Sequence, residues 1–174
     1  MLGSLYVEDP EQRFAAVRLC SDLPLDVRDF VRENGGWVLQ LPETGVSRLE
    51  YQLELLDHEG TAHVVCDPDN PQRAPGAFGE KSVLWAPGYS PPAWLDEPGL
   101  PGALEQVGIR VLGRRLEIGV WSPGSVEGEL PLLVAHDGPE YDALSGLTRY
   151  AGVMIENGSL PPFRVALLAP GERD

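Results

Sequence analysis

The stretch of this sequence with the most chemical potential is LLVAHDGPEYD, residues 132–142, in which four apolar residues lead into a histidine and three carboxylates. The apolar run predicts a buried strand, and Asp-Gly-Pro predicts a sharp turn at its carboxyl end. In α/β proteins, binding and catalytic groups gather at the carboxyl ends of strands. The stretch is therefore our candidate for the rim of a site.

The polar side chains of this stretch do not combine into an obvious acid–base pair. Adjacent residues on a strand point to opposite faces, so His136 and Asp137 are poorly placed as a general base and its orienting carboxylate. This favours a structural role for His136. Asp142 suits the N-cap of a helix, and Glu140 would benefit from the same helix N-terminus. We interpret both carboxylates as residues of a helix start.

The elements that must position this stretch change in type along the chain. Short alternating strands separated by turn residues predict a β-sandwich over about residues 1–87. A stretch rich in Pro and Gly predicts a linker over 88–103, which Tyr89 and Trp94 could pin to a neighbouring surface. Over 104–174, a hairpin precedes a strand–helix–strand (βαβ) unit. The predicted strands are 13–20, 35–42, 47–57, 61–67, 80–87, 104–113, 114–123, 129–137 and 163–170.

The predicted βαβ unit contains a helix over 142–157 between two almost continuous apolar strands. Such strands are typical of a sheet covered on both faces, so we expect Leu133, Val134 and Ala135 to be buried beside residues 165–168 in a parallel pair. One helix cannot enclose two strands this apolar. The sequence therefore predicts that a partner chain or the remainder of a domain completes the sheet.

Composition excludes several classes of partner. The net charge is −14 with only 13 basic residues, which excludes a nucleic-acid partner because phosphate binding needs clustered Lys and Arg. No apolar run reaches 18 residues, and the N-terminus lacks a signal peptide, so we expect no membrane association and a cytoplasmic location.

Cys20 and Cys66 predict buried free thiols. Asp67 and Asp69 of the DPDNP motif predict a loop staple rather than a calcium site, and we expect neither a metal nor another cofactor.

The motifs resemble the enterochelin-esterase-like family of α/β-hydrolases. The resemblance rests on DPDNP (67–71), AFGEKSVLW (77–85), GYSPPAWL (88–95), LLVAHDGPEYD (132–142) and LPPFRVALLAPGERD (160–174). It implies an immunoglobulin (Ig)-like β-sandwich followed by an incomplete α/β-hydrolase-like βαβ segment. The implied reaction is hydrolysis of a carboxylic ester through an acyl-serine, without a metal cofactor.

The sequence departs from this family at the nucleophile. The catalytic serine of an α/β-hydrolase lies in a G-x-S-x-G elbow. Ser90 follows Gly88 but is followed by two prolines and lies in the linker, and Ser125 and Ser145 lack the flanking glycines. The resemblance implies an oxyanion-hole donor in the loop after the third strand, which matches residues 138–140. Because proline has no N–H, the donor would be the backbone N–H of Gly138 or Glu140. A simple strand-end turn explains the same residues equally well.

Two functional hypotheses remain. In the first, the chain is the front portion of an esterase, inactive alone, that accepts a small-molecule ester when a further hydrolase segment completes it. In the second, it is a non-catalytic β-sandwich module that binds carbohydrate through Trp37, Trp85 and Trp94, or binds a partner chain or a second copy through the incomplete sheet.

Overall fold

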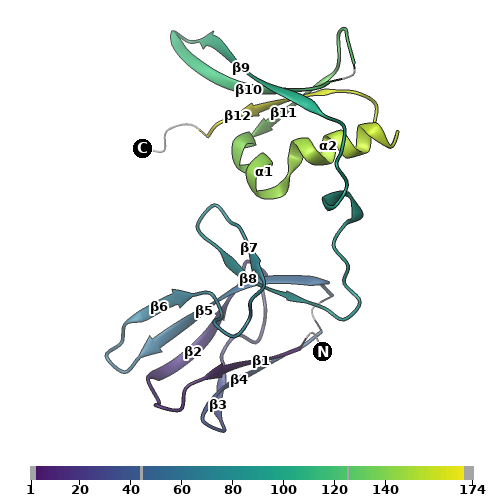
Figure 1. Ribbon diagram of the computed structural model, residues 1–174. Helices are drawn as coiled ribbons and strands as arrows, with labels where there is room; N and C mark the ends of the chain where they lie inside the picture. Colours follow the sequence, from purple (N-terminus) through teal and green to yellow (C-terminus); the bar gives the residue numbers. More distant parts are fainter. Residues whose placement is uncertain (1–2, 44, 125, 171–174) are drawn as a thin grey trace. The chain divides into compact units, whose positions relative to one another are not determined.

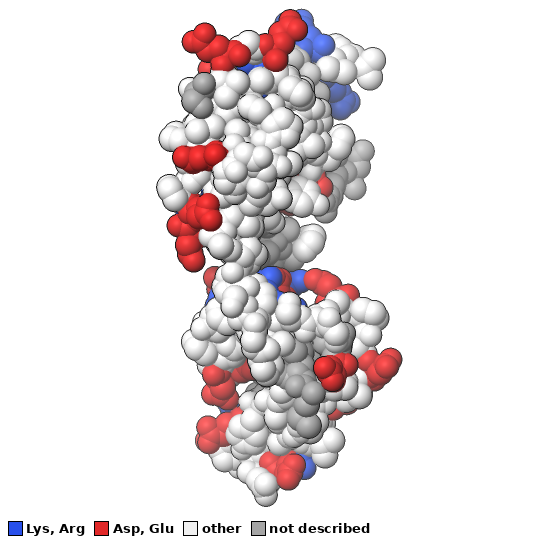
Figure 2. Space-filling view, turned by 90° about the vertical axis from the view of Figure 1, so that its right-hand side faces the viewer, with Lys and Arg blue, Asp and Glu red and all other residues white. Residues whose placement is uncertain are grey.

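The structure is a computed structural model that describes residues 3–43, 45–124 and 126–170 (Figure 1). The chain forms two compact units, unit 1 (residues 1–90) and unit 2 (residues 91–174). In the described part of the chain, no helix is long and apolar enough to cross a membrane. On the face seen in Figure 2, acidic side chains are dispersed over both units.

Unit 1 contains two antiparallel sheets. One has the strand order β1-β4-β3, and the other has the order β2-β5-β8-β7, with β6 also paired to β5. The strands are β1 (Gly3–Glu8), β2 (Phe14–Cys20), β3 (Val31–Glu33), β4 (Gly36–Leu41), β5 (Arg48–Asp57), β6 (Ala62–Val65), β7 (Arg73–Ala74) and β8 (Lys81–Trp85). The sequence pattern predicts five of these strands and misses three. The missed strands are β1, which contributes Leu5 and Val7 to the core, and the short strands β3 and β7, which have few buried residues.

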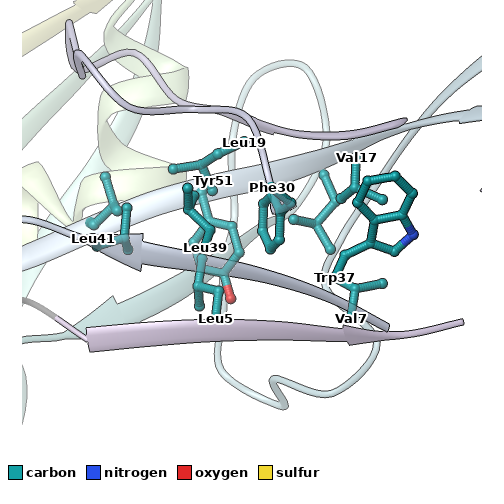
Figure 3. Packing of buried hydrophobic residues seen from close by; sticks show 11 residues of the cluster. Leu5, Val7, Val17, Leu19, Phe30, Trp37, Leu39, Leu41 and Tyr51 are labelled. Atoms are coloured by element: carbon teal, nitrogen blue, oxygen red, sulfur yellow. The ribbon is translucent and has the colours of Figure 1, made fainter. Parts of the chain in front are cut away.

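The two sheets of unit 1 share one core. Inward side chains of β1 and β4 meet those of β2 and β5, with Phe30 between them (Figure 3). The alternation in β5 explains its share, because Leu49, Tyr51 and Leu53 are fully buried while the residues between them are half-exposed. Unit 1 is therefore a two-layer β structure closed around its own core.

A buried carboxylate fixes the turn after β1. Asp9 accepts hydrogen bonds from the Arg13 N–H (2.7 Å), the Trp37 indole N–H (3.1 Å) and the Arg32 guanidinium (3.1 Å). Burial alone would raise the pKa of Asp9, but these bonds together hold it below its ordinary value. The carboxylate is therefore ionised in the fold and stabilises it.

Unit 2 contains a four-stranded sheet with the order β11-β12-β10-β9. Its elements are a 3₁₀ helix, η1 (Ala93–Leu95), followed by β9 (Gly102–Val111), β10 (Arg114–Pro123), β11 (Leu132–His136), α1 (Gly138–Ser145), α2 (Leu147–Glu156) and β12 (Arg164–Leu168). β9 and β10 form a long antiparallel hairpin, and β11 pairs with β12 in parallel. The predicted βαβ unit with a parallel strand pair is confirmed.

The helical connection differs from the prediction of one helix over 142–157. Gly146 has a φ of 64° and divides the segment into α1 and α2. Asp142 lies inside α1 rather than at its N-cap, and its carboxylate accepts hydrogen bonds from the backbone N–H (2.9 Å) and hydroxyl (2.6 Å) of Thr148. It therefore caps the start of α2. Gly158 follows α2 with a φ of 74°, as expected for the residue that ends a helix.

The two faces of the unit 2 sheet have different surroundings. Helices α1 and α2 lie on one side of the sheet (Figure 1), which we call the helix face. There, Trp121, Val165 and Leu167 pack with Ala151 of α2. We call the opposite side the far face. The register places on it Ala103, Glu105, Val107, Ile109, Val111, Arg114, Leu116, Ile118, Val120, Ser122, Leu132, Val134, His136, Arg164, Ala166 and Leu168.

The burial expected for β11 is wrong. Leu133 and Val134 are 44% and 48% exposed, and Ala135 is half-buried, whereas Val165, Ala166 and Leu167 of β12 are buried. β11 is the outermost strand of the sheet, and Val134 lies on the far face, which no other described element of unit 2 covers. Leu133 lies on the helix face, but at the edge of the sheet, where the helices leave it partly exposed. An apolar run in the sequence predicts a strand, but it does not show whether another element packs on the faces of that strand.

The predicted linker 88–103 contains the division between the units, η1 and the first two residues of β9. Tyr89 packs on Trp85 within unit 1, with ring centroids 5.6 Å apart. Trp94 meets Tyr150 of α2 edge-on at 5.3 Å within unit 2. Both aromatic residues therefore anchor this proline-rich stretch to the unit on their own side.

Candidate functional site

The turn between β11 and α1 is the candidate site. Asp137 has a φ of 53°, a left-handed conformation that redirects the chain sharply from the end of β11 into the first turn of α1. Because β11 and β12 are parallel, their carboxyl ends meet at the same edge of the sheet. The turn thus places the N-terminus of α1 at the edge where α/β proteins bind ligands.

Gly138 occupies a position that no other residue can fill without displacement. A Cβ atom added to it would lie 2.4 Å from the Cα of Leu167, far inside van der Waals contact. The backbone of α1 therefore approaches β12 closely only because residue 138 has no side chain. This gives Gly138 a structural role that exists whether or not it has a catalytic one.

The two candidate oxyanion donors differ in availability. The Glu140 N–H donates to the Asp137 carbonyl at 3.1 Å, and the Tyr141 N–H donates to the same oxygen at 3.0 Å. The Gly138 N–H has no acceptor among the described residues. Of the two donors implied by the resemblance, Gly138 is therefore the one whose N–H lacks a partner within the described ranges.

His136 lies on the far face, in register with Leu168, while Gly138 packs against the helix-face side of β12. Its side chain is exposed, and no carboxylate in the described part of the chain lies within ion-pair distance of it. Nothing described here orients His136 as a general base.

Two hollows flank α1. One of about 220 Å³ is lined by Asp137, Glu140, Tyr141, Leu144 and Ser145. The other, of about 340 Å³, lies between α1 and the β9–β10 hairpin, and Pro139 and Asp142 form part of its wall. Carboxylates line both, so neither attracts an anion through charge. An oxyanion here would depend on N–H groups and the helix N-terminus.

The described residues lack a nucleophile with a base beside it. Ser145 is the exposed last residue of α1, and Ser90 is the last residue of unit 1. Ser125 is outside the described residues, as are residues 171–174 of the last resemblance motif. Within the described ranges there is also no cluster of three His, Cys, Asp or Glu residues that could hold a metal ion.

The DPDNP motif is the loop staple that the sequence predicts. Asp67 is buried and accepts hydrogen bonds from the Tyr51 hydroxyl (2.6 Å) and the Asp69 N–H (2.9 Å). Burial and the neighbouring Asp67 raise the pKa of Tyr51, which keeps the phenol protonated as a donor. The motif ties the loop before β7 to β5.

Of the three tryptophans in the carbohydrate-binding hypothesis, two pack against other side chains of the protein. Trp37 belongs to the core of unit 1, and Trp94 packs on Tyr150. Trp85 is 44% exposed, beside a hollow of about 430 Å³ in unit 1. Cys20 and Cys66 are free thiols as predicted, but they are half-buried rather than fully buried.

The comparison with solved structures gives the fold. The enterobactin esterase Fes from Shigella flexneri, solved in the presence of enterobactin, matches 98% of this chain with a TM-score of 0.66 and 19% identity. Ferric enterobactin esterase from Salmonella typhimurium matches 95% with a TM-score of 0.69 and 17% identity. Nearly the whole of this chain therefore has the fold of about half of an enterobactin esterase.

The resemblance stated from the sequence motifs is thus confirmed as a likeness of fold. The chain spans 53% of the Shigella flexneri protein and 52% of the Salmonella typhimurium protein. No protein-family model matches the sequence, and no curated protein sequence matches it.

Proposed function

We propose that this chain is the front portion of an enterobactin-esterase-like carboxylic ester hydrolase. Unit 1 is an Ig-like domain and residues 88–103 are the linker. Unit 2 is the first part of the hydrolase domain, the part that precedes the nucleophile elbow. The observation that carries the proposal is the match of nearly the whole chain to about half of two enterobactin esterases. The hairpin followed by a parallel βαβ unit is consistent with it.

In this proposal the turn after β11 supplies one half of an oxyanion hole. Attack of a serine on an ester carbonyl places negative charge on its oxygen, and two N–H donors stabilise that charge. One is the N–H of Gly138, which has no acceptor among the residues that the structure describes, and the other is the N–H after the nucleophile, on the segment that completes the domain. The Glu140 N–H takes no part because Asp137 already accepts it.

The first test is activity of the purified chain. It should neither hydrolyse p-nitrophenyl esters nor react with a fluorophosphonate serine probe, because no described serine has a base beside it. Labelling of the isolated chain would refute the proposal that it is inactive alone.

The second test mixes the chain with a separately expressed polypeptide, the part of the Shigella flexneri esterase that this chain does not match. Gain of ester hydrolysis is the expected result.

The donor itself needs a replacement that adds no atoms, because any side chain at residue 138 collides with Leu167. Incorporation of glycolic acid at position 138 replaces the N–H with an ester oxygen and adds no Cβ. In the active mixture it should lower kcat by about 100-fold or more, the usual cost of losing an oxyanion-hole donor. The same replacement at Gly128, in the loop before β11, is the control. Equal kcat in both proteins would make Gly138 only a turn residue.

A further inference from the structure

The hollow of about 430 Å³ in unit 1 lies between β1 of one sheet and β8 of the other. In the described part of the chain these strands do not pair with each other, because β1 pairs with β4 while β8 pairs with β5 and β7. The loop of residues 67–72 supplies a third wall, and every lining residue belongs to unit 1. The lining consists of Ser4, Leu5, Tyr6, Tyr51, Asp67, Asp69, Asn70, Pro71, Gln72, Val83, Leu84 and Trp85.

The loop wall of this hollow is fixed by the fold itself. Asp67 accepts a hydrogen bond from the Tyr51 hydroxyl at 2.6 Å, and the Arg73 guanidinium donates to the Asp67 carbonyl at 3.1 Å. The Asn70 amide donates to the Val83 carbonyl at 2.8 Å. A site whose wall is already ordered loses little conformational entropy when it binds a ligand.

Four lining side chains have hydrogen-bonding capacity that the fold does not use. Within the described ranges, no hydrogen bond or ion pair involves the Asp69 carboxylate, the Gln72 side-chain amide or the Trp85 indole N–H. Ser4 accepts a hydrogen bond from Gln40 at 3.0 Å, and its own O–H has no acceptor among the described residues. Together these groups offer both donors and acceptors to a ligand.

Apolar side chains form the rest of the lining, and one of them is an aromatic platform. Leu84 and Pro71 line the hollow, and Trp85 exposes nearly half of its indole there. The Tyr89 ring packs on this indole, with ring centroids 5.6 Å apart, and so restricts its orientation. Apolar walls with a few polar groups, in a volume between about 300 and 1,000 Å³, are the usual form of a small-molecule site.

Charge restricts the class of ligand that this hollow can take. Unit 1 has 15 acidic and 7 basic side chains, and the described lining contains no lysine or arginine. An anionic ligand would therefore be repelled. The ligand that fits is neutral, has O–H groups for Asp69 to accept and has an apolar face for Trp85.

We propose that the hollow binds a neutral sugar, with one face of a pyranose ring on Trp85 and its hydroxyl groups hydrogen-bonded to Asp69 and Gln72. A pyranose presents C–H groups on its faces and hydroxyl groups around its edge, which matches an indole surface bordered by polar side chains. The proposal narrows the carbohydrate-binding hypothesis to one tryptophan of three. It concerns unit 1 alone and does not depend on the proposed hydrolase function.

The first experiment measures binding to the whole chain. The isotope-labelled protein is titrated with maltose and with cellobiose, two neutral disaccharides, and amide chemical shifts are followed by NMR. At least one sugar should give saturable shifts concentrated at residues 4–6, 67–72 and 83–85, with a Kd in the millimolar range. Absence of saturable binding by both sugars, or shifts that lie elsewhere, would overturn the proposal.

The same titration with cyclohexanol tests whether hydroxyl groups matter. Cyclohexanol has a six-membered ring but a single hydroxyl group, so it cannot satisfy the polar lining and should bind at least about tenfold more weakly than the better sugar. Saturable shifts at the hollow with cyclohexanol, without binding of either sugar, would assign the hollow to an apolar ligand and overturn the sugar proposal.

Substitutions then test the two kinds of contact separately. Trp85→Ala should raise the Kd about tenfold or more, because a large aromatic contact is lost. Phe78→Ala is the matched control, since Phe78 is a 91% exposed aromatic residue of unit 1 outside the hollow. An unchanged Kd in Trp85→Ala, or an equal rise in Phe78→Ala, would refute the site.

Asp69→Ala provides a second variant that leaves the packing of Trp85 on Tyr89 intact. It should also raise the Kd about tenfold, the usual effect of losing a hydrogen bond to a charged group. Glu59→Ala, at an exposed carboxylate outside the hollow, is its control and should bind as the wild-type chain does. Equal Kd values for Asp69→Ala and Glu59→Ala would overturn the role of Asp69. No readout here uses ester hydrolysis, so the results stand whether or not the proposed function does.

Discussion

Units 1 and 2 use the same alternating strands but differ in what faces them. In unit 1 the inward face of each sheet meets the other sheet, so Val17 on β2 is 1% exposed. In unit 2 the single sheet is covered on its helix face alone, and Val107 on β9 is 40% exposed. The comparison teaches that alternation determines which residues share a face, whereas burial depends on a second layer.

The largest expected effect concerns the closed unit. Asp9→Ala removes the acceptor of several buried or half-buried donors, including the Trp37 indole and the Arg32 guanidinium. Arg32 is 35% exposed and can be hydrated, so the cost comes mainly from the Trp37 indole and the backbone N–H groups left without an acceptor, about 1–3 kcal/mol each in free energy of unfolding. Hydrogen exchange should show the loss over β1–β5 and leave unit 2 unchanged. Asp29→Ala, which removes an exposed partner of Arg18, is the control and should change little.

The same carboxylate gives unit 1 a pH dependence. Because the folded-state pKa of Asp9 lies below its ordinary value, its contribution is present above that ordinary value and is lost as the pH falls through the folded-state pKa. Asp9→Asn should therefore flatten the acid limb of the stability curve in urea titrations. An unchanged acid limb would show that other carboxylates control it.

The next effect concerns the helix face of unit 2. Gly138→Ala forces α1 away from β12, because the new Cβ would meet the Leu167 backbone, and should destabilise unit 2 by about 1–3 kcal/mol. Exchange rates over β11 and β12 should rise while those in unit 1 stay constant. Gly119→Ala is the matched control, since its Cβ would meet only side-chain atoms, of Leu104 (3.4 Å), Gln106 (3.5 Å) and Leu167 (3.7 Å), at ordinary contact distances.

A pair of identical substitutions tests the comparison between the units directly. Val17→Thr buries a hydroxyl in the core of unit 1 and should cost about 1–3 kcal/mol. Val107→Thr on the far face should change stability by less than about 0.5 kcal/mol, because its side chain is already hydrated. Urea unfolding measures both. Equal losses would mean that the far face of the isolated chain is buried in solution.

The smallest effect is at the break between the two helices of unit 2. Asp142→Ala removes the carboxylate that caps α2 through Thr148 and should cost about 1 kcal/mol. Glu156→Ala, at the exposed end of α2, is the control and should be neutral. If both variants unfold at the same urea concentration, the Thr148 contacts do not stabilise the connection.

Local patterns predicted the elements better than their surroundings. The alternation over 47–57 predicted β5 and its buried side chains, and two apolar runs predicted the parallel pair. The break at Gly146 was missed because a glycine inside a helical pattern is usually tolerated, and nothing local shows that it takes a left-handed conformation.

The candidate site was predictable only in outline. Residues 136–142 indicated a strand-end turn, which the structure contains. The sequence could not separate Gly138 from Glu140 as a donor, because their availability depends on the Asp137 carbonyl and on the approach of β12. The exposure of Leu133 and Val134 was also unpredictable, since it depends on whatever lies beside β11.

The two-residue turn of the β9–β10 hairpin has a consequence for the order of folding. Val111 pairs with Arg114 across Leu112 and Gly113, both with positive φ, so the hairpin closes through neighbours in sequence. Such a hairpin forms within about 1–10 μs, while β12 must wait for a loop of some forty residues to close before it can pair with β10. We expect the hairpin to form first and to act as the template on which the parallel strands of unit 2 assemble.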